Sequence, residues 1–252
     1  MVIKSYQCLA TLSLALFLEL AMSTSLPGTA TSLSNRQQEP ALSGGEIVAQ
    51  RRSRLRFKVP NIRPTGNLEG GAARGNCSTE KIEIKALLPN TNIGLTTAQK
   101  PTFFFQISKT SAKEAKFSLW NATGGDSYET QFPLTNTGGV MSFTLPADAP
   151  PLEVGKEYHW EVAAICDTGD GDQGGNTHVQ GAITRAQPSP TFASQVQAAS
   201  PRDRVALYAQ EGYWHDALKA LADLRSANPN DPSLVSDWTD LLNSHELNTS
   251  AQ

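Results

Sequence analysis

Three aspartates on a glycine-rich run have the type and spacing that come closest to a chemical site in this sequence. Asp167, Asp170 and Asp172 lie in residues 167–176, which read DTGDGDQGGN. Carboxylates clustered on a turning loop are ligands that Ca²⁺ prefers, and extracellular calcium is plentiful enough for weak sites. The order is not that of an EF-hand loop, because the bidentate Glu at its end is missing. We interpret the run as a hairpin loop, with a weak calcium site as the alternative.

No catalytic residue, cofactor motif or metal-ligand set can be argued from the rest of the chain. The four histidines lack ligand spacing, and we expect structural or surface roles for them; they are His159, His178, His215 and His245. No Cys–His pair, Ser–His–Asp set or nucleophile elbow is evident. The sequence therefore predicts no cofactor and favours a non-enzymatic protein.

Paired acids give the one enzymatic alternative. Glu153, Glu157 and Glu161 would have to face a cleft to act on cell-wall or exopolysaccharide glycans. Their alternation along a strand favours an exposed face instead. The tryptophans fall at strand or helix periodicity, so packing in the core explains at least three of the four better than carbohydrate stacking.

The N-terminus has the layout of a secretory signal peptide. Lys4 precedes the apolar run 8–22, and small residues frame a cleavage site at Ala21 and Ser23, with Gly28 and Ala30 as the alternative. We predict a signal peptide at 1–23, and so a periplasmic, envelope-associated or extracellular protein. An uncleaved anchor is the alternative, but the run is short of the roughly 20 residues that a span needs.

Cys77 and Cys166 are the cysteines that remain after cleavage. In an oxidising compartment two such cysteines are expected to pair, and two buried thiols are the alternative. Closing a loop of this length would stabilise the fold by roughly 4–5 kcal/mol in the chain-entropy treatment.

Residues 77–186 carry the pattern of a β-domain. Ile82, Ile84 and Ala86 alternate with charged residues, and so do the apolar residues that lead to Trp160 and Val162. About seven short strands separated by Gly and Pro turns predict an antiparallel β-sandwich. The piece around Leu152–Val162 looks like the inward-alternating strand of immunoglobulin-like or fibronectin III-like domains.

The segments around this domain have the composition of linkers. Residues 24–76 are rich in Ser, Gly, Pro and Gln and include the basic run 51–58, so we predict a disordered linker with a solvated tether. Residues 187–199 read as a second linker, and 246–252 as a flexible tail.

Residues 200–245 predict a small α-helical unit. Ser200 can cap a helix that starts at Pro201. A tetratricopeptide-like helix pair followed by a third helix is indicated by four residues at the repeat's spacing: Gly212, Ala217, Leu221 and Pro229. One repeat does not make an array. The unit either stabilises the β-domain or docks a partner.

The whole pattern resembles the family catalogued as domain of unknown function 928 (DUF928), known mainly from cyanobacterial proteins with signal peptides. The resemblance covers about 50–247 and is carried by residues 74–77, 94–96, 100–105, 150–160, 166–167, 198–204 and 208–242. It implies an exported protein and, less directly, the Cys77–Cys166 pairing. It implies no activity.

The leading hypothesis is an exported, non-enzymatic binding or scaffold protein of the cell envelope. A protein partner would dock on the C-terminal helices. A formal net charge of −3 argues against nucleic-acid binding, and no further segment could span a membrane. A glycan-binding or glycan-processing sandwich protein is the alternative, and the sequence leaves the oligomeric state open.

Overall fold

The computed structural model describes residues 55–66, 72–77, 80–125, 127–135, 137–166 and 177–244. These residues all belong to one compact unit, Arg51–Gln252. The predictions for the signal peptide (1–23), for most of the linker 24–76, for the aspartate run 167–176 and for the tail 246–252 fall outside them.

Four strands form the first sheet, in the order β1-β2-β4-β7. They are β1 (Ala72–Cys77), β2 (Glu80–Ala86), β4 (Thr102–Ile107) and β7 (Gly139–Thr144). Each neighbouring pair is antiparallel. The predicted alternation holds in β2, where Ile82 and Ile84 are buried and Lys81, Glu83 and Lys85 are exposed.

Five strands form the second sheet, in the order β3-β9-β8-β5-β6. They are β3 (Ile93–Thr96), β9 (His178–Arg185), β8 (Glu157–Ile165), β5 (Glu114–Asn121) and β6 (Ser127–Pro133). The expected all-antiparallel pattern fails at one place, because β3 pairs with β9 in parallel. β3 is a short strand that crosses from the first sheet to the second between β2 and β4, and local alternation carries no information on the direction of its distant partner.

Aromatic side chains join the two sheets into one core. The ring centroid of Phe103 in β4 lies 4.8 Å from that of Phe117 in β5 and 5.3 Å from that of Trp160 in β8. All three are fully buried. Each such side chain contributes roughly 1.5–3 kcal/mol through the removal of its apolar surface from water. The two sheets therefore pack face to face.

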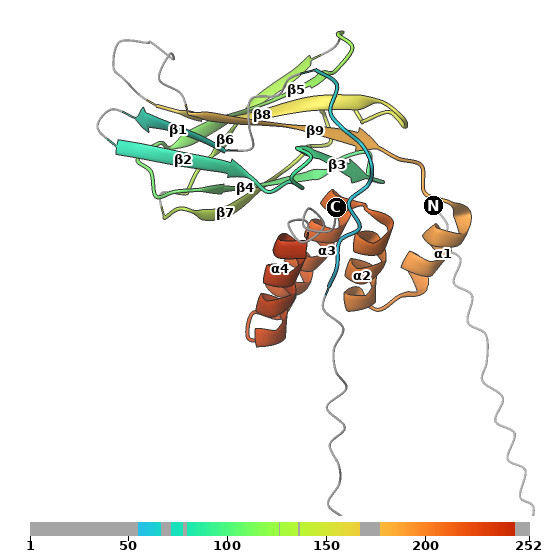
Figure 1. Cartoon of the computed structure of the whole chain (residues 1–252). Helices are drawn as coiled ribbons and strands as arrows, with labels where there is room; N and C mark the ends of the chain where they lie inside the picture. The colour runs from blue at the N-terminus through green and yellow to red at the C-terminus, as the bar shows by residue number, and fades with distance from the viewer. Residues whose placement is uncertain are drawn as a thin grey trace, which may run out of the picture. The chain divides into compact units, whose positions relative to one another are not determined.

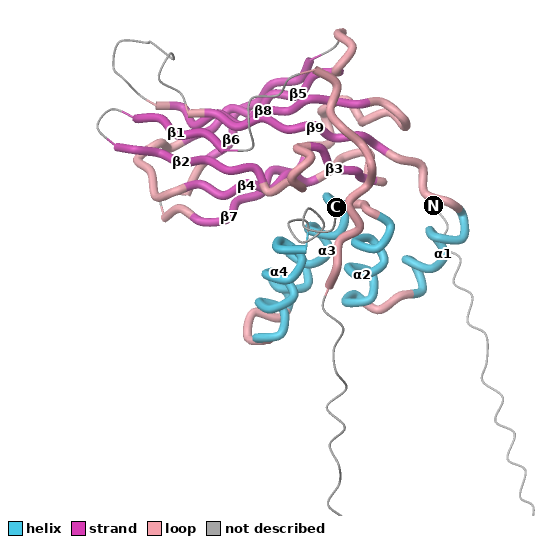
Figure 2. Tube along the Cα trace, in the orientation of Figure 1, coloured by secondary structure: helices cyan, strands magenta, loops and turns pink. Residues whose placement is uncertain are grey.

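Four helices follow the strands in the described part of the chain and gather together beside the sheets (Figure 1 and Figure 2). They are α1 (Pro190–Ala198), α2 (Pro201–Glu211), α3 (Trp214–Ala227) and α4 (Pro232–Ser244). The predicted start at Ser200 is confirmed, since its side chain accepts a hydrogen bond from the Asp203 N–H.

The linker predicted at 187–199 is wrong over most of its length, because it contains α1. Ser189 caps this helix and Pro190 is its first residue, the same device as at the start of α2. Phe192 is buried, with its ring centroid 5.2 Å from that of Tyr213 in the α2–α3 turn. One aromatic side chain is enough to fix a helix whose composition otherwise looks like a linker.

The folded domain also begins earlier than the predicted boundary at Cys77. The Phe57 N–H donates to the Ser244 hydroxyl at 3.0 Å, and its ring packs edge-on against Trp214 at 4.7 Å. Residues 55–66, here called the N-terminal segment, then run from the helices across the five-stranded sheet (Figure 1), where Thr65 donates from its N–H and its hydroxyl to the Glu157 carboxylate. Two apolar side chains in a polar sequence, Leu55 and Phe57, sufficed for this docking.

A candidate ligand cleft between the helices and the sheets

The N-terminus of α3 is anchored in the β-domain through two buried side chains. The Trp214 indole N–H donates to the Leu87 carbonyl at 2.7 Å, and His215 Nδ1 donates to the Thr102 carbonyl at 3.1 Å. These bonds fix the N-terminal end of α3 against the strands, and a cleft lies beside this helix.

This cleft has a volume of about 540 Å³, which lies within the range of small-molecule sites. It is bounded by α2 and α3 on one side and by the β3–β4 connection, the start of β4 and the end of β7 on the other. Side chains that bring polar groups to it are Lys100, Thr102, Thr144, Arg204, Tyr208, Asp216, Lys219 and Asp223. Apolar surface comes from Pro101, Ala220, Leu224 and Ala227.

Asp216 is the best-held acidic group in the cleft. Its two carboxylate oxygens accept hydrogen bonds from the Thr97 N–H at 2.9 Å and from the Thr97 hydroxyl at 2.8 Å. Burial raises the pKa of Asp216 above its usual value, and the hydrogen bonds from Thr97 partly oppose this. Burial also raises the pKa of Tyr208, and the nearby Asp216 charge adds to the effect. The two groups therefore form an oriented acceptor beside a phenol that stays neutral.

His215 forms a neutral part of the cleft wall. Because a carbonyl can only accept, the bond to Thr102 places the proton on Nδ1 and leaves Nε2 as a bare acceptor. Nε2 is buried without a hydrogen-bond partner and lies against Gly94, where a Cβ would stand 2.6 Å away. Burial lowers the pKa of His215 from 6.5 to about 4, so the imidazole is uncharged at neutral pH.

The cations at the cleft are already engaged by the protein. Lys100 Nζ donates to the Ala149 carbonyl, and Lys219 Nζ bonds Asp223 at 2.7 Å one helical turn away. Arg204 Nε donates to the Ala199 carbonyl at 3.1 Å. Because Asp216 and Asp223 offset two of these three positive charges, the cleft has only a small excess charge and suits an amphipathic ligand of low net charge.

The structure places the four predicted repeat residues in the α2–α3 pair or directly after it. Gly212 ends α2 with φ of +83°, the left-handed conformation of a tight turn, while Ala217 and Leu221 are fully buried in α3. Pro229 follows α3 and lines a second cleft. Leu221 and the buried strand residues belong to one core cluster, so this side of α3 faces the protein interior. A ligand has access to the cleft and not to that buried side.

Most of the other predicted site residues cannot be placed relative to this cleft. Asp167, Asp170 and Asp172 fall outside the described residues, and so does the side chain of Cys77, so the calcium site and the Cys77–Cys166 disulfide stay predictions. Within the described ranges no group of three His, Cys, Asp or Glu side chains could hold a metal ion. In the same residues no helix is long and apolar enough to cross a bilayer.

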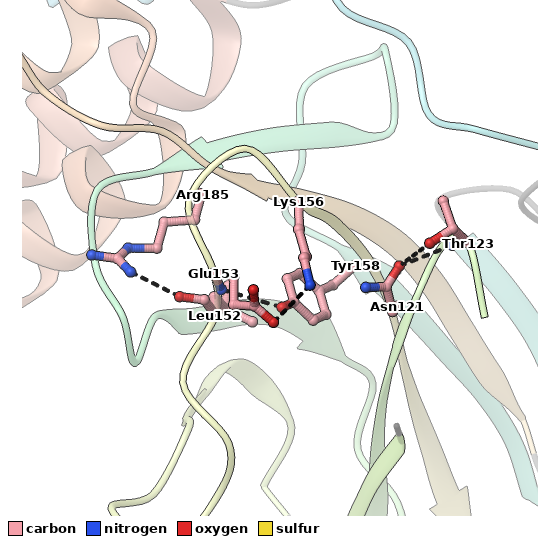
Figure 3. Close-up of polar contacts among 7 residues, drawn as sticks. All are labelled: Asn121, Thr123, Leu152, Glu153, Lys156, Tyr158 and Arg185. Atoms are coloured by element: carbon pink, nitrogen blue, oxygen red, sulfur yellow. Dashed lines mark hydrogen bonds and ion pairs between the residues drawn. The ribbon is translucent and has the colours of Figure 1, made fainter. Parts of the chain in front are cut away.

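The three glutamates of the glycan alternative contact protein groups on or beside β8. Glu153 pairs with Lys156 at 2.8 Å, as Figure 3 shows, and Glu161 accepts from the Gln180 amide at 2.9 Å. The Glu157 carboxylate accepts hydrogen bonds from Thr65, and its Oε1 lies 3.0 Å from His159 Nε2.

Figure 3 also shows the corner that leads into β8. The Tyr158 hydroxyl accepts a hydrogen bond from the Glu153 N–H at 3.2 Å, and Arg185 donates to the Leu152 carbonyl at 2.9 Å. These bonds hold the entry to β8 against the end of β9. None of these four residues lines the cleft between the helices and the sheets.

Comparison with known protein families shows which family the chain belongs to. Residues 69–252 match the model of the family described as Domain of Unknown Function (DUF928). The chain belongs to the DUF928 family. A search of curated proteins finds no match. The match spans the β-domain and all four helices, so the fold that frames the cleft lies within the DUF928 domain.

Sequence reasoning missed the cleft residues themselves. Asp216 and Thr97 are separated by 119 positions, and nothing local marks them as neighbours. The one local feature is the position of Asp216 in the first turn of α3. An acidic residue there is explained by the helix dipole alone, so it does not indicate a contact with the end of a strand.

Proposed function

We propose that this DUF928 protein is an exported, non-enzymatic binding protein and that the cleft between the helices and the sheets holds its ligand. The observation that carries the proposal is the cleft itself: about 540 Å³ of space with apolar walls and a carboxylate held in place by two hydrogen bonds. A few oriented polar groups in a mostly apolar cavity are typical of ligand sites. The matching ligand has an apolar body and a hydrogen-bond donor that reaches Asp216.

We further infer that the β-domain is of the immunoglobulin or fibronectin III type. The strand order β2-β4-β7 facing β9-β8-β5-β6 corresponds to the order A-B-E facing G-F-C-C′ in that class. Tyr158, at the start of β8, accepts a bond from a backbone N–H five residues upstream, which is the arrangement of a tyrosine corner. Such a domain is a scaffold, and it specifies no ligand.

The helices fit a solitary tetratricopeptide-like pair, α2 and α3, with α4 as its closing helix. α1 packs on the other side of the pair through Phe192 and Tyr208. A solitary pair cannot build the concave groove of an array. In this proposal the docking surface is therefore shared between α2, α3 and the strand ends.

Export and the Cys77–Cys166 bond belong to the same proposal. The support is the N-terminal pattern Lys4, apolar run and small residues, together with the burial of Cys166 at the end of β8. An N-terminus that starts at about residue 24 in the mature protein, read by mass spectrometry, would support export. Intact 1–23 in the purified cellular protein would count against it.

The decisive experiment fills the cleft. We would compare the native protein with Ala220→Trp, which places an indole in the cleft, and with Ala193→Trp, on an exposed position of α1 outside it. Each is incubated with small-molecule and peptide fractions of envelope extract, and bound masses are read by native mass spectrometry. We expect the same ligand on the native protein and Ala193→Trp, and none on Ala220→Trp. Equal occupancy in all three proteins would remove the cleft from consideration.

A further inference from the structure

Strand β7 is an outer strand of the four-stranded sheet, and its free edge lacks the residues that usually prevent pairing. Its sequence GVMSFT contains neither a charged residue nor a proline. Charges and prolines are common means by which edge strands avoid other strands. In the second sheet, β6 carries Glu129 and Pro133, and β3 is only 4 residues long, another common means of limiting pairing. Of the three edge strands β3, β6 and β7, β7 is the one whose sequence and length do not oppose pairing with another strand.

The hydrogen bonds of its neighbour β4 show which groups of β7 face outward. Leu145 donates to the Pro101 carbonyl at 3.0 Å, so the odd-numbered positions of β7 bond β4. Independently, the Phe104 carbonyl accepts from the N–H of Leu87, the residue after β2, which leaves Phe103 and Phe105 to bond β7. The alternation of an antiparallel ladder then directs the N–H and C=O groups of three residues to the open edge: Val140, Ser142 and Thr144.

An apolar cleft lies beside this edge. It has a volume of about 420 Å³ between β7 and the α3–α4 turn, and its lining includes Phe104, Met141 and Trp238. Its lining also holds Val140, which is 47% exposed, and Val235 of α4, which is 55% exposed. Two of the three large apolar side chains that are exposed in the described residues thus lie beside the free edge.

We propose that β7 pairs with β7 of a second copy of this chain, so that two four-stranded sheets join across a twofold axis. A second copy fits because the edge is neutral, so self-pairing brings no like charges together. The outward groups are also spaced for antiparallel exchange with themselves. Burial of the Val140 and Val235 surfaces would add to the backbone bonds.

The register follows from the two faces of the strand. Directly opposed residues must lie on the same face, since a shift by one residue would exchange core and surface. Pairing centred on Ser142 opposes Ser142 to itself and Val140 to Thr144, and it uses all three outward positions of each copy. That register gives about six hydrogen bonds between the strands, more than its neighbours give.

The test uses charge at the centre of this register. Ser142→Lys would place two ammonium groups opposite each other, and Ser142→Glu two carboxylates, while Ser127→Lys puts the same charge on the exposed start of β6. By sedimentation velocity we expect a dimer for the native protein and for Ser127→Lys. Either Ser142 variant should raise the dissociation constant at least about tenfold. A mixture of Ser142→Lys and Ser142→Glu should recover the dimer, because opposite charges then face each other.

Cross-linking provides the second measurement. The opposed residues lie about 5.5 Å apart between Cα atoms in such a pair, within reach of a disulfide. Ser142→Cys should therefore form a covalent dimer on mild oxidation, and Ser127→Cys should not. A native protein that is monomeric at about 100 µM overturns the proposal, as does a dimer that both Ser142 charge variants leave intact, or a Lys–Glu mixture that stays monomeric. A monomer that instead adds a foreign extended peptide to β7 also overturns it.

Discussion

The free energy of unfolding should fall as the pH is lowered from 6.5 towards 4, because burial disfavours the protonated form of His215 in the folded protein. The imidazole is 2% exposed, and burial lowers its pKa from 6.5 to about 4. Protonation would add a charged N–H at Nε2, which lies against the Gly94 backbone and not against an acceptor. The unfolded chain binds this proton more readily than the folded one.

The sign and size follow from proton linkage. Between pH 6.5 and about 4 the unfolded state carries more protons at this site, so the free energy of unfolding rises with pH in that window. A depression of this size corresponds to about 3 kcal/mol, fully present above pH 6.5 and lost once the pH is below about 4. Asp216 acts in the opposite sense, because its raised pKa means that the folded protein holds its proton more tightly as pH rises above 3.8.

The assay compares the native protein with His215→Asn, which keeps a donor for the Thr102 carbonyl but does not titrate. Urea unfolding at several pH values from 7 to 4.5, followed by tryptophan fluorescence, gives the free energy of each protein. The variant should be less stable at pH 7 by about 1–3 kcal/mol, from lost packing, and this deficit should shrink as the pH falls. Asp216 is present in both proteins, so its contribution largely cancels in the difference. A deficit that stays constant from pH 7 to 4.5 would refute the reasoning.

Three further changes test the packing of the domain. Gly94→Ala should cost about 1–3 kcal/mol, measured as a lower urea midpoint, because the new Cβ would stand 2.6 Å from His215 Nε2. Gly212→Ala should cost about 1–2 kcal/mol because a side chain is disfavoured at its φ of +83°, and an unchanged melting temperature would contradict this. The new Cβ would also lie 3.0 Å from the Lys58 carbonyl, so hydrogen exchange in the N-terminal segment should become faster. If Cys77 and Cys166 pair, thiol titration of the unfolded, unreduced protein will detect neither, and reduction will lower the melting temperature; two titratable thiols would show that the bond is absent.

Local patterns predicted the elements well where one periodicity governed them. Alternation in β2 and β8 and the Ser–Pro start of α2 needed only neighbouring residues. The same reasoning placed Phe57 and Phe192 in linkers, because a single aromatic in a polar run has no periodicity to reveal it. Phe57 packs against Trp214, which is far away along the chain. Phe192 packs against Tyr213, from which it is separated by the rest of α1 and the whole of α2.

The sequence by itself determined most of the strands, the start of α2 at Ser200 and which family the chain resembles. Those properties rest on φ/ψ preferences, capping and apolar spacing, all of which act within a few residues. Only the tertiary structure decided that β3 runs parallel to β9, that Asp216 meets Thr97, and that the edge of β7 stays open beside Val140 and Val235. Each of these depends on which distant surfaces come together to bury apolar area, and a local pattern leaves that choice open.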